Sequence, residues 1–364
     1  MTPLRDPLIR IRKVIMKRII GILSAMLFIL LTLGGCGNTA GSAPDAAAGK
    51  EGDSLHIVTT IFPEYDWVRN VLGENPAGIT TTFLLDAGVD LHSFQPAAED
   101  ILKISTCDLF LYVGGESEEW VQDALQEKVN ENMIVLNLLD LLGERVKEEE
   151  LVEGMQEEDH DHEHEEEHED PSGEDHDHDE EHAEYDEHVW LSLKNAMVLV
   201  EEIEKAIAAM DPANEAVYRE NAEAYIASLA ALDQQYADMV AAAEGKTLLF
   251  GDRFPFRYLT EDYGLSYYAA FAGCSAETEA SFETVVFLAE KTDALSLPAV
   301  LTIEGGDGKI AETIVQATTK KDQKILTLDS MQSTTAHDAE YGASYLSIME
   351  NNLRVIQEAL GQEN

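Results

Sequence analysis

Seven histidines stand in a short and strongly acidic stretch of the sequence, inside a segment that runs from residue 148 to residue 187. They are His160, His162, His164, His168, His176, His178 and His182. Their spacing builds no apolar face at the period of a helix or a strand, so it predicts a solvated, mobile loop. Imidazole suits zinc, copper and nickel, and the interspersed carboxylates concentrate cations nearby. The stretch predicts weak capture of divalent metal ions; the alternative is an acidic linker without a specific role.

A second group of metal-ligating residue types follows predicted strands. His92 lies in a loop after the second strand, and His188 follows the histidine-rich loop. Asp252, Glu304 and Asp329 each end or follow a strand of the second half. Ligands of open α/β sheets bind beyond the carboxyl ends of the strands, so we expect these side chains to face a common cleft. Two imidazoles with one or two carboxylates complete a four-coordinate site for zinc, or a larger site for manganese.

Each of these residues also has a simpler interpretation. His92 can be a surface histidine, and His188 can be the last of the loop histidines. Asp329 can form a turn, Asp252 can pair with an arginine, and Glu304 can accept hydrogen bonds from backbone amides. We retain His92, His188, Asp329 and Asp252 as candidate metal ligands, and we expect Glu304 to be structural.

Two alternations of strands and helices must position these side chains. In the first half, strands are predicted at 55–61, 79–85, 109–113 and 134–138, with helices at 63–72, 97–105 and 117–129. In the second half, strands are predicted at 247–250, 265–270, 300–304 and 325–328, with helices at 254–262, 282–292, 310–319 and 343–359. This alternation is typical of parallel sheets covered by helices. The predicted fold class is α/β, with two lobes that each hold a four-stranded sheet.

Two long helices separate the lobes. Ser192 is placed to cap the first, at 193–210, and Asp211 with Pro212 is placed to start the second, which reaches about Ala243. At about 1.5 Å per residue the second helix would be on the order of 45 Å long. We interpret it as a rigid bridge between the lobes; the alternative is an ordinary long surface helix.

The N-terminus has the pattern of a secretory signal, with a basic region before an apolar run at 19–33. The run is shorter than the ~20 residues of a spanning helix. Leu33–Cys36 resembles a bacterial lipobox, which implies lipidation of Cys36; an ordinary signal peptide is the alternative. The predicted organisation is a signal peptide at 1–35, a lipidated tether at 36–54, a first lobe at 55–210, a linking helix at 211–244 and a second lobe at 245–364.

The overall charge narrows the class of partner. The chain has 364 residues and a formal net charge of -47, which excludes nucleic acid and anionic membrane surfaces as partners. The cysteines beyond Cys36 are Cys107 and Cys274, which fall in different lobes, so a disulfide between them is not favoured. No Cys-x-x-Cys motif is present, which excludes zinc fingers and thioredoxin-like sites.

Four motifs carry a resemblance to a known family. Thr59–Pro63, Gly88–Pro96, His188–Leu191 and Tyr345–Leu353 resemble the zinc and manganese solute-binding lipoproteins of ABC importers. The histidine-rich loop is similar to that of the family's ZnuA-like zinc branch. The resemblance covers about residues 55–360. It implies two α/β lobes, a rigid linking helix, and a metal ion held between the lobes for delivery to a membrane permease that a cytoplasmic ATPase drives.

The resemblance also implies a ligand set, from which this chain departs at one position. His92 and His188 match the family's first two histidine ligands, and Asp329 is similar in position to a second-lobe carboxylate. The family's third ligand, a His or Glu, aligns with Arg253. A guanidinium stays protonated and cannot ligate a metal. Either Asp252 takes that place, or Asp329 and water complete the site.

We therefore predict a monomeric receptor, lipid-anchored on the outer face of a bacterial cell membrane, which captures Zn²⁺ or alternatively Mn²⁺. We expect no catalysed reaction. One rival is a secreted zinc-dependent hydrolase; the one His-Glu-x-x-His spacing in the sequence, His164–His168, lies in the acidic loop and not on a predicted helix, where a metalloprotease motif would have to stand. The other is a surface adhesin or metal buffer without a transporter.

Overall fold

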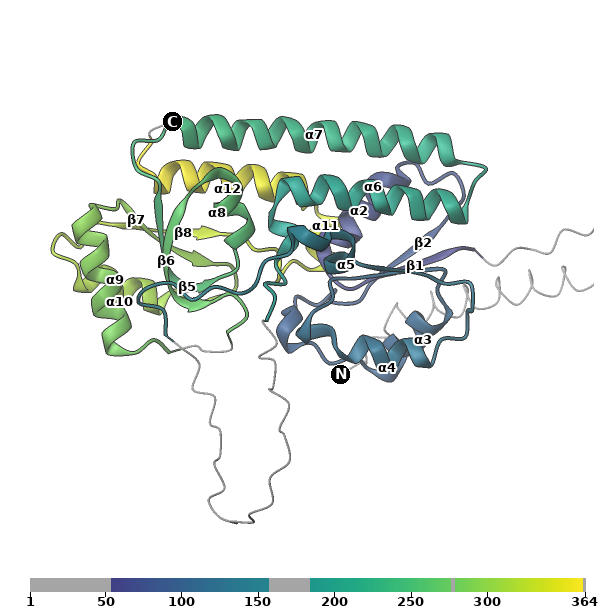
Figure 1. Ribbon diagram of the computed structural model, residues 1–364, viewed down its shortest axis with the longest axis horizontal. Coiled ribbons are helices and arrows are strands. Elements are labelled where there is room, and N and C mark those ends of the chain that lie inside the picture. Colours follow the sequence, from purple (N-terminus) through teal and green to yellow (C-terminus); the bar gives the residue numbers. More distant parts are fainter. Residues whose placement is uncertain (1–53, 157–183, 276–278, 363–364) are drawn as a thin grey trace, which may run out of the picture. The chain divides into compact units, whose positions relative to one another are not determined.

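Two four-stranded sheets, one in each half of the chain, form the frame of the computed structural model (Figure 1). The structure describes residues 54–156, 184–275 and 279–362, within one compact unit from Asp53 to Asn364. The first sheet holds β1 (His56–Thr59), β2 (Thr80–Phe83), β3 (Leu109–Tyr112) and β4 (Ile134–Asn137), in the order β2-β1-β3-β4. The second holds β5 (Thr247–Phe254), β6 (Ser266–Ala272), β7 (Ala299–Ile303) and β8 (Lys324–Leu328), in the order β6-β5-β7-β8.

Every strand pair in both sheets is parallel, and the two sheets repeat one strand order. The predicted fold class, two βα lobes with four-stranded parallel sheets, is confirmed. Parallel pairing brings the carboxyl ends of the strands to one edge of each sheet. The loops that carry His92, after β2, and Asp329, after β8, leave from these edges.

Helices cover the sheets of both lobes. In lobe one they are α2 (Phe62–Leu72), α3 (Ala98–Thr106), α4 (Trp120–Gln126) and α5 (Leu138–Leu142). In lobe two they are α8 (Arg257–Tyr263), α9 (Phe282–Leu295), α10 (Lys309–Ala317), α11 (Ala336–Glu340) and α12 (Tyr345–Ala359). Among the described residues, no helix combines the length and the apolar character that a membrane span requires.

The two long helices are α6 (Leu193–Met210) and α7 (Glu215–Ala242). Ser192 caps α6 as predicted, because its hydroxyl accepts a hydrogen bond from Asn195 N. The predicted start of α7, with Asp211 as N-cap and Pro212 as the first helical residue, is three residues too early, because Asn214 is the N-cap and Glu215 the first helical residue. The Asp211 carboxylate accepts hydrogen bonds from the Asn214 and Tyr218 side chains, so it closes the turn between the helices instead of capping α7.

Helix α7 is in contact with both lobes (Figure 1). Its 28 residues span about 42 Å at 1.5 Å per residue. In its first half, Asn221 donates a hydrogen bond to Val71 O of α2, and in its second half Tyr236 donates one to Met349 O of α12. These contacts support the interpretation of α7 as a rigid bridge.

The main apolar core runs through both lobes without a break. Trp67 of lobe one packs edge-on against Tyr345 of lobe two, with ring centroids 5.2 Å apart. Tyr345 in turn donates to Trp190 O, and Trp190 donates to Ser330 O. Lobes that share buried aromatic side chains cannot open without exposing them to water, so we expect any movement between them to be small.

Other boundaries differ from the sequence-based expectation near the candidate site. The helix predicted at 117–129 is a 3₁₀ turn at Glu116–Glu118 followed by the shorter α4. Strand β5 runs four residues longer than predicted, with a register shift between Phe250 and Arg253. Such irregularities re-aim side chains at the end of a strand. The predicted signal peptide, the tether with Cys36 and the seven loop histidines lie outside the described residues.

Candidate metal centre

His92 is held by a 3₁₀ turn, Leu91–Ser93, in the loop that follows β2. The Asp90 carboxylate caps this turn by accepting a hydrogen bond from His92 N at 3.0 Å. An aspartate two residues before the capped amide is a common way to fix a tight turn. The Asp90 cap therefore fixes the backbone from which the His92 imidazole projects.

His188 is fully buried and immediately precedes the 3₁₀ turn Val189–Leu191 that leads into α6. One oxygen of Asp186 accepts a hydrogen bond from His188 N at 2.9 Å and lies 3.0 Å from His188 Nδ1. Burial lowers the pKa of His188, but the hydrogen bond to Asp186 and the nearby carboxylates outweigh it, so its pKa is raised.

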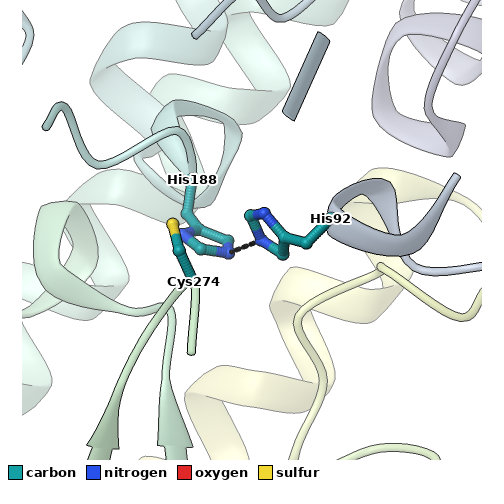
Figure 2. Close-up of side chains that lie close together, drawn as sticks. All are labelled: His92, His188 and Cys274. Atoms are coloured by element: carbon teal, nitrogen blue, oxygen red, sulfur yellow. Dashed lines mark hydrogen bonds between the residues drawn. The ribbon is translucent and has the colours of Figure 1, made fainter. Parts of the chain in front are cut away.

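The two imidazoles meet through their Nε2 atoms, which lie 3.1 Å apart (Figure 2). Zn–N bonds of about 2.0–2.1 Å at a tetrahedral angle place two ligating nitrogens roughly 3.3 Å apart. The spacing between His92 and His188 is therefore close to that of two ligands on one ion. The rings come from different elements, one after β2 and one before α6, as the sequence predicted.

A carboxylate supports the far side of each ring. Asp186 faces Nδ1 of His188, while Nδ1 of His92 lies 2.7 Å from Ser117 Oγ and 3.4 Å from Glu187 Oε2. Glu187 Oε1 accepts from Ser117 N, which fixes this carboxylate. Burial raises the pKa of Glu187, but its hydrogen bonds with His92 and Ser117 reverse the shift and lower it. Metal-ligating histidines in proteins are oriented by such partners on the second ring nitrogen.

Cys274 is the third residue of this group, and sequence reasoning did not find it. Donor atoms of His92, His188 and Cys274 all lie within 4.8 Å of one another, the only such group of His, Cys, Asp or Glu in the part of the chain that the structure describes. Cys274 follows β6, so the rule that placed Asp252 and Asp329 at strand ends also points to it. Burial and nearby carboxylates raise the pKa of its thiol. Cys107 and Cys274 are both free.

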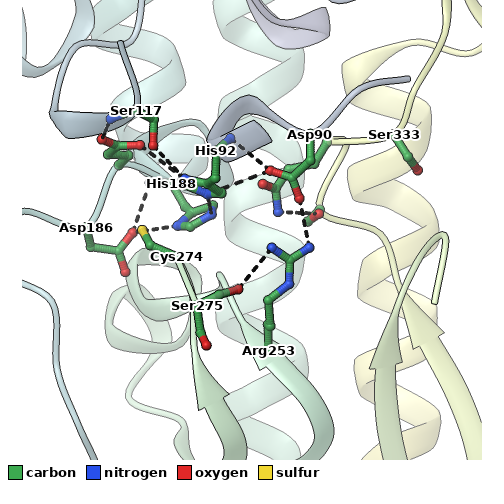
Figure 3. Close-up of polar contacts among 12 residues, drawn as sticks. Asp90, His92, Ser117, Asp186, His188, Arg253, Cys274, Ser275 and Ser333 are labelled. Carbon is green, nitrogen blue, oxygen red and sulfur yellow. Dashed lines mark hydrogen bonds and ion pairs between the residues drawn. The ribbon is translucent and has the colours of Figure 1, made fainter. Parts of the chain in front are cut away.

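Arg253 lies near the two histidines, and its guanidinium points toward Asp90 (Figure 3). Its guanidinium pairs with Asp90 at 2.7 Å and donates to Ser275 O at 3.4 Å. Burial raises the pKa of Asp90, but His92 and Arg253 more than offset this and lower it. Arg253 therefore links the loop of His92 to the loop of Cys274.

The predicted second-lobe carboxylates are engaged with the backbone. Asp252 uses both oxygens, accepting from Arg253 N at 2.9 Å and from Ile303 N at 3.2 Å. Asp329 uses one oxygen, accepting from Met331 N at 2.8 Å. Neither belongs to the group around His92. Burial and the neighbouring Glu304 raise the pKa of Asp329 to about 6.

Glu304 has the structural role that the sequence suggested. Its carboxylate accepts hydrogen bonds from Ser330, from Gln332 N and from Ser333 N, in the loop after β8. It shapes the loop that follows Asp329 and stays away from the imidazoles.

The two ends of the histidine-rich segment lie next to this centre. Glu148 and Tyr185 form an antiparallel bridge, and Gln156 N donates to Ala270 O of β6. Between them, Glu149 accepts a hydrogen bond from Cys274 N at 3.1 Å. The chain that leads into the segment therefore contacts the loop that carries Cys274.

Comparisons with known proteins agree on one family of zinc-uptake components. The family model described as zinc-uptake complex component A periplasmic, ZnuA, matches residues 57–359. The zinc-binding lipoprotein AdcA of Streptococcus pneumoniae is 30% identical over 314 residues, covering 85% of this chain and 56% of AdcA. The chain thus spans about half the length of AdcA. The high-affinity zinc uptake system protein ZnuA of Bacillus subtilis is 30% identical over 330 residues, covering 91% of this chain and 94% of that protein.

A solved structure agrees with the sequence relatives. The crystal structure of the Zn(II)-bound ZnuA-like domain of Streptococcus pneumoniae AdcA superposes with a TM-score of 0.63 at 26% identity. The match covers 85% of this chain and 100% of that chain. The likeness therefore extends over both lobes and is not confined to one sheet.

Proposed function

The chain belongs to the ZnuA family of zinc-uptake components, and we propose that it captures Zn²⁺ with His92 and His188 and delivers it to an ABC importer. The observation that carries this proposal is the pair of imidazole nitrogens 3.1 Å apart, each ring backed by a carboxylate. The family consists of solute-binding components and not of enzymes, so we set the metallohydrolase alternative aside.

Zinc is the better choice of ion. The related AdcA is named a zinc-binding lipoprotein, and its ZnuA-like domain has been crystallised with Zn(II). Two imidazoles at tetrahedral spacing suit zinc, whereas manganese prefers a larger shell of oxygen donors.

A carboxylate of lobe two is proposed to join the histidines. Asp329 is the better of the two predicted candidates, because one of its oxygens accepts no hydrogen bond from the described residues. Both oxygens of Asp252 accept backbone hydrogen bonds, which it would have to give up. We therefore propose Asp329 or a water molecule at the open position, and a structural role for Asp252.

The wider setting follows the relatives. Lipidation at Cys36 would hold the protein on the outer face of the membrane, next to the permease and ATPase that take up the ion. The seven histidines between residues 160 and 182 would collect zinc weakly, and the receptor would act as a monomer. The ends of that segment lie beside the metal centre, which supports a transfer from the segment to the two histidines.

Isothermal titration tests the proposal, in a background where the seven segment histidines are replaced by glutamine. We expect one tight zinc site, and its loss in H92A combined with H188A. The control is H337A, since His337 lies on α11 and contacts Tyr341. Absence of zinc binding, or binding that survives loss of both histidines, would contradict the proposal.

A further inference from the structure

We infer that Cys274 supplies a thiolate as the third protein ligand, so that the receptor site is of the His₂Cys type and selects thiophilic ions over Mn²⁺. The inference rests on the proposed function and deepens it, because it names the donor that replaces the imidazole or carboxylate expected at Arg253. It also names the class of ions that such a site takes.

The loop of Cys274 is built to lie against the histidines. Gly273 precedes the cysteine, and a Cβ there would come within 3.0 Å of both His188 Cε1 and Phe254 O. A side chain at this position would force the loop or the buried ring to shift by a few tenths of an ångström. With glycine in place, the donor atoms of Cys274, His188 and His92 come within 4.8 Å of one another.

The backbone on both sides of the sulfur is held by charged groups. Glu149 accepts from Cys274 N at 3.1 Å, and Arg253 donates to Ser275 O at 3.4 Å. Arg253 also pairs with Asp90, whose other oxygen caps the turn of His92. The cation at the position of the missing ligand therefore ties the cysteine loop to the histidine loop, and Asp90 offsets its positive charge.

The other described cysteine shows what a structural cysteine looks like in this fold. Cys107 is fully buried in the apolar core, and its thiol donates to Ile104 O at 3.2 Å. Cys274 belongs to neither apolar cluster and lies among His188, Asp186 and Glu149 instead. A cysteine in polar surroundings next to two imidazoles fits ligation better than packing.

The chemistry of the donors sets the choice of ion. Zn–S bonds of about 2.3 Å and Zn–N bonds of about 2.0–2.1 Å place sulfur and nitrogen roughly 3.6 Å apart on a tetrahedral ion, so the group need contract only slightly. On binding, the S–H bond breaks, an S–metal bond forms and the proton leaves to the solvent. Soft thiolate favours Zn²⁺ and Cd²⁺, while Mn²⁺ favours carboxylate and water.

Cobalt provides a direct test, because Co²⁺ takes zinc sites and a thiolate ligand adds a sulfur-to-metal charge-transfer band in the near ultraviolet. We would load the compact unit Asp53–Asn364 with Co²⁺ and record spectra of the parent, C274S and C107S. The band is expected in the parent and in C107S and absent in C274S. The segment histidines cannot produce it, since they offer no sulfur.

Affinity measurements complete the test. C274S should lose about a hundredfold or more in zinc affinity, since even groups that only orient a ligand are worth 10–100-fold. C274D should raise the affinity for Mn²⁺ relative to Zn²⁺, because it replaces a soft donor by a hard one. Melting curves of the metal-free variants check that each one folds.

The outcomes separate this inference from the proposed function. If the parent binds zinc through His92 and His188, shows no charge-transfer band with Co²⁺, and C274S binds zinc as tightly as the parent, the thiolate is not a ligand and only this inference fails. If the parent binds no zinc, the proposed function itself fails. A band together with a weakened C274S supports both.

Discussion

On the lobe-one side of the metal centre, the donors point at a common position and their backing groups are already in place. His92 and His188 face each other, with Glu187 and Asp186 on the far ring nitrogens. On the lobe-two side, the carboxylates of Asp252 and Glu304 accept hydrogen bonds from backbone amides, Asp252 from Arg253 and Ile303 and Glu304 from the loop after β8. Lobe one therefore presents two supported imidazoles, whereas two of the acidic side chains at the strand ends of lobe two are used to hold the backbone.

The difference between the lobes shows which ligands are already ordered before the metal ion binds. A ligand whose second nitrogen is hydrogen-bonded loses little freedom when the ion arrives, so lobe one is prepared in advance. Lobe two contributes a cysteine held by its backbone and Asp329, which has one uncommitted oxygen. The affinity should therefore depend strongly on the lobe-one carboxylates and weakly on the acidic side chains of lobe two.

Among changes to the acidic residues around the site, the largest effect is expected from D186N at pH 8. Asp186 contacts both the backbone N and the Nδ1 of the fully buried His188, so its loss frees the ring and removes a negative charge. We expect zinc affinity to fall by about 10–100-fold, measured by competition with a chelator. The matched control is D262N, which removes a partly buried carboxylate that contacts Ser192 and Lys194 at the start of α6, away from the two imidazoles. An equal loss in both variants would mean that the effect is not local to the site.

The next effect is the pH dependence of zinc binding. The pKa of metal-free His188 is raised above 6.5, because its hydrogen bond to Asp186 and the nearby carboxylates outweigh burial. Zinc must displace the proton of His188, so this ring should add about tenfold per unit to the loss of affinity, with an onset at a pH above 6.5. The Cys274 thiol, whose pKa is raised by burial and nearby carboxylates, adds its own tenfold per unit at higher pH. D186N lowers the pKa of His188, so it should move the onset for this ring to lower pH. An onset that D186N leaves unchanged would contradict this assignment.

The fold could be predicted from the sequence because its strands and helices have local sequence patterns. Apolar runs separated by turn residues gave all eight strands, and Ser192 gave the start of α6. The histidines could be found because each lies in a motif beside a predicted element, His92 after the second strand and His188 before the first long helix. Asp211 was wrongly predicted as the N-cap of α7, because its carboxylate accepts hydrogen bonds from the side chains of Asn214 and Tyr218 and not from backbone amides of the helix.

The ligand set was less accessible because it depends on contacts between distant segments. Nothing near Cys274 in the sequence reveals that His188 lies across from it, and an isolated cysteine is usually a small core residue. Asp252 lies at a register shift in β5, and both of its oxygens accept hydrogen bonds from backbone amides, which neither composition nor hydrophobic periodicity predicts. The ion pair between Arg253 and Asp90 could not be predicted either, because it joins residues of different lobes that lie far apart in the sequence.

A smaller effect is expected from the lobe-two carboxylates themselves. D329N should weaken zinc binding by about tenfold or less, because a water molecule can take the position of a single oxygen donor. D252N should leave the affinity unchanged, because both of its oxygens serve the backbone. Titration of the two variants side by side separates them. A loss of affinity in D252N alone would place Asp252 on the ion, as the alignment of Arg253 with a ligand position first suggested.

The smallest effect concerns the stability of the metal-free protein. Burial and Glu304 raise the pKa of Asp329 to about 6, so the folded state holds this proton more tightly than the unfolded chain does. Folding stability is therefore lost as the pH rises from about 4, the pKa of an aspartate in the unfolded chain, to about 6, the pKa of Asp329 in the folded state. At pH 7.5 the ionised carboxylate destabilises the folded state. D329N should raise the melting temperature by about 2–4 °C at pH 7.5 and by much less at pH 4.5. E340Q, an exposed change at the end of α11, serves as the control. A gain in melting temperature that is the same at both pH values would show that the charge of Asp329 is not its source. Binding of the metal ion would then relieve no electrostatic repulsion between Asp329 and Glu304.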